Sequence, residues 1–132
     1  MALKPILIVD DEPIVRESLR DWLQDAGYRV MTAESGEQAL DMITKQDFCV
    51  LILDIRLPGR TGIAVLKEVR DKKPDMKAII ITAYPTSDLT AEALRLGAMD
   101  CLVKPIVPDD LERLVRDAVR KYQSENQGGG TK

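Results

Sequence analysis

Five short apolar segments alternate along the chain with five longer segments of helical periodicity. The apolar segments cover residues 6–9, 29–33, 48–53, 78–82 and 101–103. Each is too short to be a helix, and the segments between them place apolar residues every three or four positions. A strand followed by a helix, repeated five times, is typical of a parallel sheet with helices on both faces. The sequence therefore predicts an α/β fold, a doubly wound parallel sheet of five strands with five helices.

The composition of the segments predicts which strands are central. Residues 6–9 and 48–53 are apolar throughout, as strands covered on both faces should be. Segment 29–33 mixes polar and apolar residues and segment 101–103 is short, so both are expected at the edges of the sheet. Pro13 is expected to begin the first helix, and Gly27 to end it. Gly97 is expected as the left-handed cap of the fourth helix, residues 87–96.

Length and composition fit one domain, which we expect over residues 1–123. The chain has 132 residues, of which 45% are hydrophobic, and residues 123–132 contain no apolar side chain to bury. Residues 124–132 are therefore predicted to form a flexible tail or linker.

Charge and hydropathy exclude several classes of partner. The 19 Lys and Arg residues against 22 Asp and Glu residues produce a net charge of −3, so no bulk attraction to nucleic acid or to anionic membranes is expected. The longest apolar runs fall far short of the roughly 20 residues that cross a bilayer. The N-terminal segment lacks the pattern of a secretory signal. We expect a cytoplasmic protein, with no membrane binding and no direct nucleic-acid binding by this domain.

The chain contains no histidine, which removes the commonest general base and the commonest zinc ligand. Its two cysteines lie in separate apolar segments without metal-ligand spacing, which favours free thiols. Any chemistry must therefore use carboxylates, hydroxyls, lysine or a bound metal.

Polar residues lie at the carboxyl ends of four of the five predicted strands. Asp10 and Asp11 follow the first, Asp54 the third, Thr82 ends the fourth, and Lys104 follows the fifth. Taken singly, each has an ordinary explanation as a helix cap, turn residue, strand residue or surface charge. Because the carboxyl ends of parallel strands meet at one edge of a sheet, where ligands bind, the joint pattern predicts a functional site.

The segments that carry these residues resemble those of response-regulator receiver domains, the CheY-like family of two-component signal transduction. The matching segments are ILIVDDE at 6–12, LILDIRLPG at 51–59, ITAY at 81–84 and GAMDCLVKP at 97–105. The resemblance implies a flavodoxin-like fold with strand order 2-1-3-4-5, which agrees with the central and edge strands predicted above. It also implies a cis peptide bond between Lys104 and Pro105.

The resemblance also implies roles for the residues at the strand ends. Asp54 would accept a phosphoryl group, with Thr82 and Lys104 contacting that group. Asp11 would bind Mg²⁺ or Mn²⁺ directly and Asp10 through water, and the metal site would be completed by Asp54 and the backbone carbonyl of Arg56.

Electrostatics supports a metal at such a site. Two like charges about 4 Å apart repel by roughly 4 kcal/mol at an effective dielectric constant of about 20. Three acids and one lysine carry a formal charge of −2, which a divalent cation cancels. The available ligands are hard oxygens, which Mg²⁺ prefers.

A phosphorylation-dependent signalling switch is therefore expected, rather than an enzyme in the ordinary sense. Because the chain has no histidine, a phosphohistidine donor must belong to a partner, a sensor histidine kinase or phosphotransfer protein. Small phosphodonors and self-dephosphorylation are also expected to act on Asp54. The resemblance places the output on the fourth helix, fifth strand and fifth helix, which in this family also support phosphorylation-dependent homodimers. The chain would be a stand-alone receiver or the receiver portion of a longer, transcriptional regulator.

One departure from the family pattern and three alternatives accompany this interpretation. Cys101 stands where receivers usually carry a switching Tyr or Phe, so we expect Thr82 to act through Tyr84 or through the fourth helix, or Cys101 simply to pack as a small apolar residue. A phosphatase that uses an aspartyl nucleophile would need an acid where Arg56 stands, and a flavodoxin-like cofactor site would be repelled by the acids after the first strand. The remaining alternative is a receiver-like binding module that is not phosphorylated.

Overall fold

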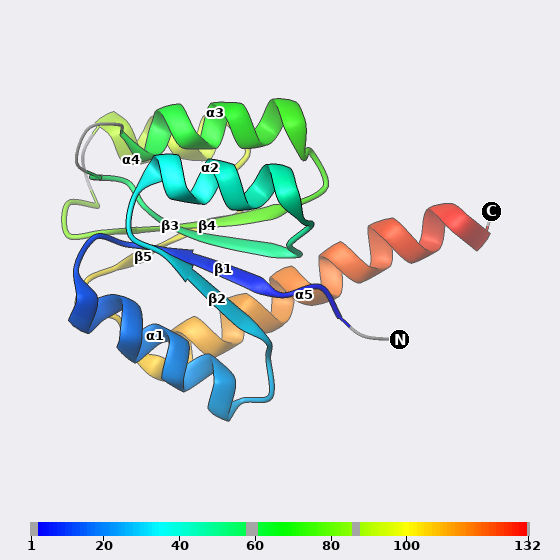
Figure 1. The fold of residues 1–132 in the computed structure, drawn as a ribbon, viewed down its shortest axis with the longest axis horizontal. Helices are drawn as coiled ribbons and strands as arrows, with labels where there is room; N and C mark the ends of the chain where they lie inside the picture. Colours follow the sequence, from blue (N-terminus) through cyan, green and yellow to red (C-terminus); the bar gives the residue numbers. More distant parts are fainter. Residues whose placement is uncertain (1–2, 58–60, 86–87, 132) are drawn as a thin grey trace.

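A five-stranded parallel sheet organises the computed structural model, which describes residues 3–57, 61–85 and 88–131, with side chains through residue 126. The strand order is β2-β1-β3-β4-β5, as predicted, and a helix follows each strand (Figure 1). The strands are β1 (Ile6–Val9), β2 (Val30–Ala33), β3 (Val50–Asp54), β4 (Lys77–Thr82) and β5 (Asp100–Val103). The helices are α1 (Pro13–Asp25), α2 (Gly36–Lys45), α3 (Gly62–Lys72), α4 (Asp88–Arg95) and α5 (Pro108–Thr131).

Both faces of the sheet are covered, because alternate strand residues pack into two separate cores. Helices α2, α3 and α4 cover one face, and α1 and α5 cover the other (Figure 1). Leu7 of β1 and Leu51 of β3 belong to the first core, whereas their neighbours Ile8 and Ile52 belong to the second. All four side chains are completely buried, which accounts for the uninterrupted apolar sequence of the central strands.

Local sequence signals begin and end the helices as expected. Pro13 is the first residue of α1, and the Ser35 hydroxyl accepts a hydrogen bond from the backbone N–H of Gln38 at the start of α2. Gly27 and Gly97 follow α1 and α4 with φ of 99° and 100°, a conformation that glycine adopts without a steric penalty.

The predicted strand bounds differ from the observed ones by one or two residues. Strand β3 begins at Val50 rather than at residue 48, although the backbone N–H of Cys49 donates to the carbonyl of Pro5. It also extends to Asp54, and α4, observed over Asp88–Arg95, ends one residue before the predicted residue 96. Ser87, and Pro58 and Gly59 of the quoted motif, lie outside the described residues.

The C-terminal segment differs more. We expected no regular structure beyond residue 123, but α5 continues through Thr131 and projects past the sheet (Figure 1). Extending a formed helix costs less than starting one, although Gly128, Gly129 and Gly130 are poor helix formers. In addition, Glu125 pairs with Lys77 of β4, and the Asn126 amide donates to the Tyr122 carbonyl at 2.8 Å. The domain boundary after residue 123 stays a prediction.

None of the helices in the described part of the chain combines the length and hydropathy needed to span a membrane.

Candidate functional site

Strand register brings the predicted site residues to one edge of the sheet. Val9 of β1 pairs with Leu53 of β3, so the residues that follow them, Asp10 and Asp54, lie side by side. Thr82 of β4 pairs with Val103 of β5, and the next residue, Lys104, donates its backbone N–H to the Thr82 carbonyl at 2.8 Å. The four side chains therefore come from four different segments that only the fold unites.

The Lys104 ammonium lies at the centre of the site, among three carboxylates. Its Nζ is 2.9 Å from Asp54 Oδ2, 2.8 Å from Glu12 Oε1 and 3.1 Å from Asp10 Oδ2. Burial alone would lower the pKa of Lys104, but the hydrogen bonds donated to Glu12 and Asp54 and the nearby Asp10 raise it above its ordinary value. The lysine therefore stays positively charged at neutral pH.

Asp10 forms the buried floor of the site, with no exposed surface. Its Oδ1 accepts the backbone N–H of Glu12 at 2.8 Å. Its Oδ2 is close enough to Lys104 for an ion pair but outside hydrogen-bond geometry, so this buried oxygen has no hydrogen-bond partner among the described residues. Burial, and then repulsion from Asp54, raise the pKa of Asp10 more than its backbone hydrogen bond and Lys104 lower it.

Asp54 is nearly buried, with 5% of its surface exposed. Its Oδ1 accepts the backbone N–H of Arg56 at 3.0 Å, and its Oδ2 accepts from Lys104. These two contacts fix the carboxylate at the base of a pocket of about 250 Å³, which is lined by Asp11, Glu12, Asp54, Arg56, Thr82, Ala83, Tyr84 and Lys104.

Thr82 is buried and connects the pocket to α4 through one intervening residue. The Thr82 hydroxyl accepts the backbone N–H of Tyr84 at 2.9 Å. The carbonyl of Tyr84 accepts a hydrogen bond from the hydroxyl of Thr90, a buried residue of α4, at 3.2 Å. The peptide groups of Tyr84 are thus held by two threonines, one of them at the site.

Arg56 and Tyr84 form one wall of the pocket. The Arg56 guanidinium carbon lies 4.3 Å from the centre of the Tyr84 ring, a cation–π contact. Tyr84 is 55% exposed, so this stacked pair borders both the pocket and solvent.

The structure brings together most of the residues predicted from the sequence, and adds one. Asp10, Asp54, Thr82 and Lys104 converge, and Asp11 and Arg56 line the same pocket. The carboxylates within 4.8 Å of one another are, however, those of Asp10, Glu12 and Asp54. Glu12 has no role in the predicted site, although it directly follows Asp11 in the quoted motif.

The acidic group fits a hard divalent cation. All of its potential ligands are carboxylate oxygens, and Asp10 Oδ2 is a buried acceptor without a hydrogen bond. Asp10, Asp54 and either Asp11 or Glu12 could therefore hold Mg²⁺ at the edge of the sheet.

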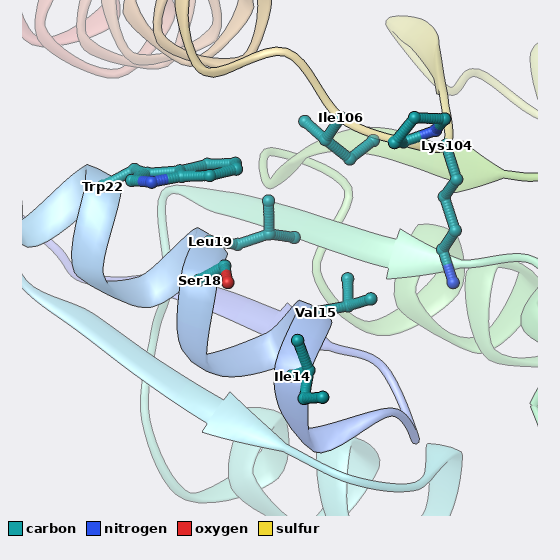
Figure 2. Close-up of a pocket in the computed structure, with 8 residues that line it drawn as sticks. Ile14, Val15, Ser18, Leu19, Trp22, Lys104 and Ile106 are labelled. Atoms are coloured by element: carbon teal, nitrogen blue, oxygen red, sulfur yellow. The ribbon is translucent and has the colours of Figure 1, made fainter.

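An apolar groove adjoins the pocket between α1 and the connection from β5 to α5. Figure 2 shows Ile14, Val15, Leu19 and Trp22 of α1 facing Ile106 across it, with Lys104 at one end. Lys104 lines both the groove and the carboxylate pocket. Ile14 is 81% exposed, although it is a large apolar residue.

Two expectations concern β5. The peptide bond between Lys104 and Pro105 is cis, as the resemblance implies. Both cysteines are free; Cys49 is buried, whereas Cys101 is only partly buried and packs against the core formed with α2, α3 and α4. Cys101 therefore packs as a small apolar residue at the position where a switching Tyr or Phe would be usual.

Most of the chain matches a known protein family. Residues 6–116 match the family model described as the response regulator receiver domain. Sporulation initiation phosphotransferase F of Bacillus subtilis is 38% identical over 122 residues, covering 92% of this chain and 95% of that protein. The alginate biosynthesis transcriptional regulatory protein AlgB of Pseudomonas aeruginosa is 42% identical over 106 residues, covering 80% of this chain. The chain spans only 24% of the length of AlgB.

Solved structures agree with this assignment. A CheY-like receiver domain protein from Methanospirillum hungatei superposes with a TM-score of 0.90 at 31% identity, covering 94% of this chain and 99% of that one. The response regulator TrrA of Thermotoga maritima, solved with Mg²⁺ and BeF, has a TM-score of 0.77 at 42% identity, covering 88% of this chain and 99% of that one.

Proposed function

The chain belongs to the response-regulator receiver domain family, and from this membership we propose that it is a switch whose Asp54 accepts a phosphoryl group. The observation that carries the proposal is the geometry around Asp54. Its Oδ2 lies 2.9 Å from a lysine ammonium, at the base of a pocket that also contains the hydroxyl of Thr82. A nucleophile beside a fixed positive charge is what phosphoryl transfer requires of a protein.

The proposed reaction forms an acyl phosphate. A carboxylate oxygen of Asp54 attacks phosphorus, the bond from phosphorus to the donor breaks, and its electron pair leaves with the donor. Lys104 then donates a hydrogen bond to one phosphoryl oxygen and Thr82 to another. Both groups already lie at the pocket, so the transfer requires only that the Thr82 hydroxyl turn and that the Lys104 ammonium exchange a carboxylate oxygen for a phosphoryl oxygen.

We assign the metal to the same pocket, held by Asp10, Asp11, Asp54 and the backbone carbonyl of Arg56. Bound Mg²⁺ or Mn²⁺ supplies positive charge that offsets the acids and the transferred group. The buried Oδ2 of Asp10, which accepts no hydrogen bond from the described residues, supports this assignment, as does the Mg²⁺ in the similar structure of TrrA. The proposal assigns this ligand to Asp11 and not to Glu12.

The donor is proposed to be a sensor histidine kinase or a phosphotransfer protein. This chain has no histidine of its own, and a protein donor must cover the rim of the pocket to reach Asp54. The groove along α1 offers an apolar surface at that rim, continuous with the site through Lys104 (Figure 2). Ile14 is the most exposed large apolar residue of this surface, so a docked donor would remove more apolar area from water at Ile14 than at its neighbours.

Incubation with acetyl phosphate tests the function without a partner. With Mg²⁺ present, we expect the intact protein to gain about 80 Da, the mass of one phosphoryl group. Mass spectrometry should find no gain with Asp54→Asn or with EDTA, whereas Asp41→Asn, an exposed acid on α2, should behave as the wild type does. An unmodified wild-type protein would instead support the alternative, a receiver-like binding module that is not phosphorylated.

The signal is proposed to travel from Thr82 to α4 through Tyr84. When the Thr82 hydroxyl turns to the phosphoryl group, it leaves the backbone N–H of Tyr84, and the Thr90 hydroxyl transmits the displacement to α4. This route needs no aromatic residue at the position of Cys101.

Beryllofluoride with Mg²⁺ should shift the amide resonances of residues 83–100 in the wild-type protein. Thr90→Val removes the hydroxyl that joins α4 to Tyr84 and should reduce the shifts of α4 by roughly half or more, while those near Thr82 persist. Thr44→Val, which removes a similar hydroxyl-to-carbonyl bond on α2, serves as the control. Full α4 shifts in Thr90→Val would exclude this route.

The output is proposed to be the face formed by α4, β5 and α5. Val103 and Val107 are exposed there beside a shallow pocket lined partly by Asp110 and Arg113, a mixture of apolar and charged residues that suits a protein contact. A phosphorylation-dependent homodimer and an effector domain in a longer, transcriptional regulator are the outcomes proposed for this face. The cytoplasm is the proposed location.

A further inference from the structure

Glu12 contacts Lys104 in the site, and its position at the start of α1 does not explain this contact. Its Oε1 lies 2.8 Å from the Lys104 Nζ, while 59% of its side chain is exposed. Glu12 is the N-cap residue of α1, but its side chain makes no capping hydrogen bond. The carboxylate is therefore directed to Lys104 rather than to the end of the helix.

The three acids around Lys104 differ in how firmly they are held. Asp10 and Asp54 are almost completely buried, and each accepts a backbone N–H through its Oδ1, from Glu12 and Arg56 respectively. Glu12 reaches the lysine from the mouth of the pocket on a longer and exposed side chain. Of the three, it can release the ammonium with the least rearrangement.

We propose that Glu12 is a positioning residue that restrains Lys104 in the resting site and gives way to a phosphoryl oxygen when Asp54 is modified. The inference rests on the proposed function and adds a regulatory contact to it. An ammonium has three N–H donors; Glu12 and Asp54 each accept one of them, and Asp10 lies 3.1 Å away as an ion pair without a hydrogen bond. A phosphoryl oxygen on Asp54 has to compete with these carboxylates for the ammonium, and Glu12 is the one that is not held by a second hydrogen bond.

The exchange predicts that Glu12 slows phosphorylation. Its contact must be broken, and its negative charge at the mouth repels an incoming phosphate donor. Glu12→Gln keeps the size of the side chain and removes the charge, so we expect acetyl phosphate to modify this variant about three- to tenfold faster than the wild type.

The experiment compares phosphorylation rates of the full chain with acetyl phosphate and Mg²⁺ in low salt and in about 0.5 M NaCl, where charges separated by more than a few ångströms are screened. Glu17→Gln, the same change at an exposed position of α1, is the matched control. If only Glu12→Gln is phosphorylated faster, and if the difference persists in salt, the effect comes from the contact between Glu12 and Lys104. A general electrostatic repulsion of the phosphate donor would be screened by the salt. The ¹⁵N resonance of the Lys104 side chain should also change in Glu12→Gln and not in Glu17→Gln.

The outcomes separate this inference from the function on which it rests. Equal rates for Glu12→Gln and Glu17→Gln, with a normal wild-type adduct, would overturn the role of Glu12 alone. Slower modification of Glu12→Gln with weakened Mg²⁺ affinity would also overturn it, because Glu12 would then act as a metal ligand. A wild-type protein that gains no phosphate would overturn both.

Discussion

Replacement of Gly62 by alanine is expected to lower the free energy of unfolding by about 3 kcal/mol, the upper range for overpacking a dense interior. A Cβ at this first residue of α3 would lie 2.5 Å from the carbonyl oxygen of Asp54 and 2.7 Å from the Cα of Ile55. Both atoms belong to the backbone, so no side chain can turn away to relieve the clash. The end of β3 must move instead, and Asp54 with it.

The effect should therefore be seen in function as well as in stability. We expect urea unfolding to show the loss, and phosphorylation by acetyl phosphate to slow by tenfold or more, since small errors in the placement of a nucleophile are costly. Gly27→Ala is the control: it has a φ of +99° but no atom within 4 Å of the added Cβ, so it should cost only about 1–2 kcal/mol and leave the rate unchanged. Equal losses in the two variants would show that the close approach at Gly62 is unimportant.

The sequence was sufficient to predict what depends on strand ends. The apolar composition of β1 and β3 placed both strands in the centre, and parallel strands bring their carboxyl ends together. Asp10, Asp54, Thr82 and Lys104 therefore had to share one edge of the sheet once five parallel strands were inferred. The order of the strands came from the resemblance and not from the residues alone.

Side-chain contacts across the fold could not be predicted in the same way. The pairing of Glu12 with Lys104 depends on two segments 92 residues apart and on the direction of both side chains. Glycine is needed at position 62 because α3 approaches the end of β3 closely there. The residues around position 62 do not indicate this approach. The apolar periodicity that identifies helices also failed beyond Tyr122, because residues 123–131 contain no apolar side chain from which a stripe could be recognised.

The site itself is a source of instability that bound metal should relieve. The pKa of Asp10 is raised, mainly by burial, so the folded protein holds this proton more firmly than the unfolded chain. The folded state is therefore penalised as pH rises from the ordinary carboxyl pKa through the raised one, and the penalty is complete above it. Acidification from neutral pH through that window should recover this part of the stability.

Asp10→Asn is accordingly expected to stabilise the metal-free protein at pH 7 by about 1 kcal/mol, the usual size of a point-mutation effect, because it removes the charge whose burial raises the pKa of Asp10. The lost ion pair with Lys104 offsets only part of this gain, since Glu12 and Asp54 still surround the ammonium. Urea unfolding in EDTA measures the difference, and Asp41→Asn, which removes an exposed charge from α2, should change stability by less than about 0.5 kcal/mol.

Added Mg²⁺ should reverse the comparison. At a concentration about a hundredfold above its dissociation constant, a ligand that binds only the folded state stabilises it by about 2.7 kcal/mol. The wild type should gain this amount, whereas Asp10→Asn, which lacks the buried carboxylate, should gain little. A metal-free Asp10→Asn protein that is less stable than the wild type would show that the ion pair with Lys104 outweighs the cost of burying Asp10. An equal response of both proteins to Mg²⁺ would remove Asp10 from the metal site.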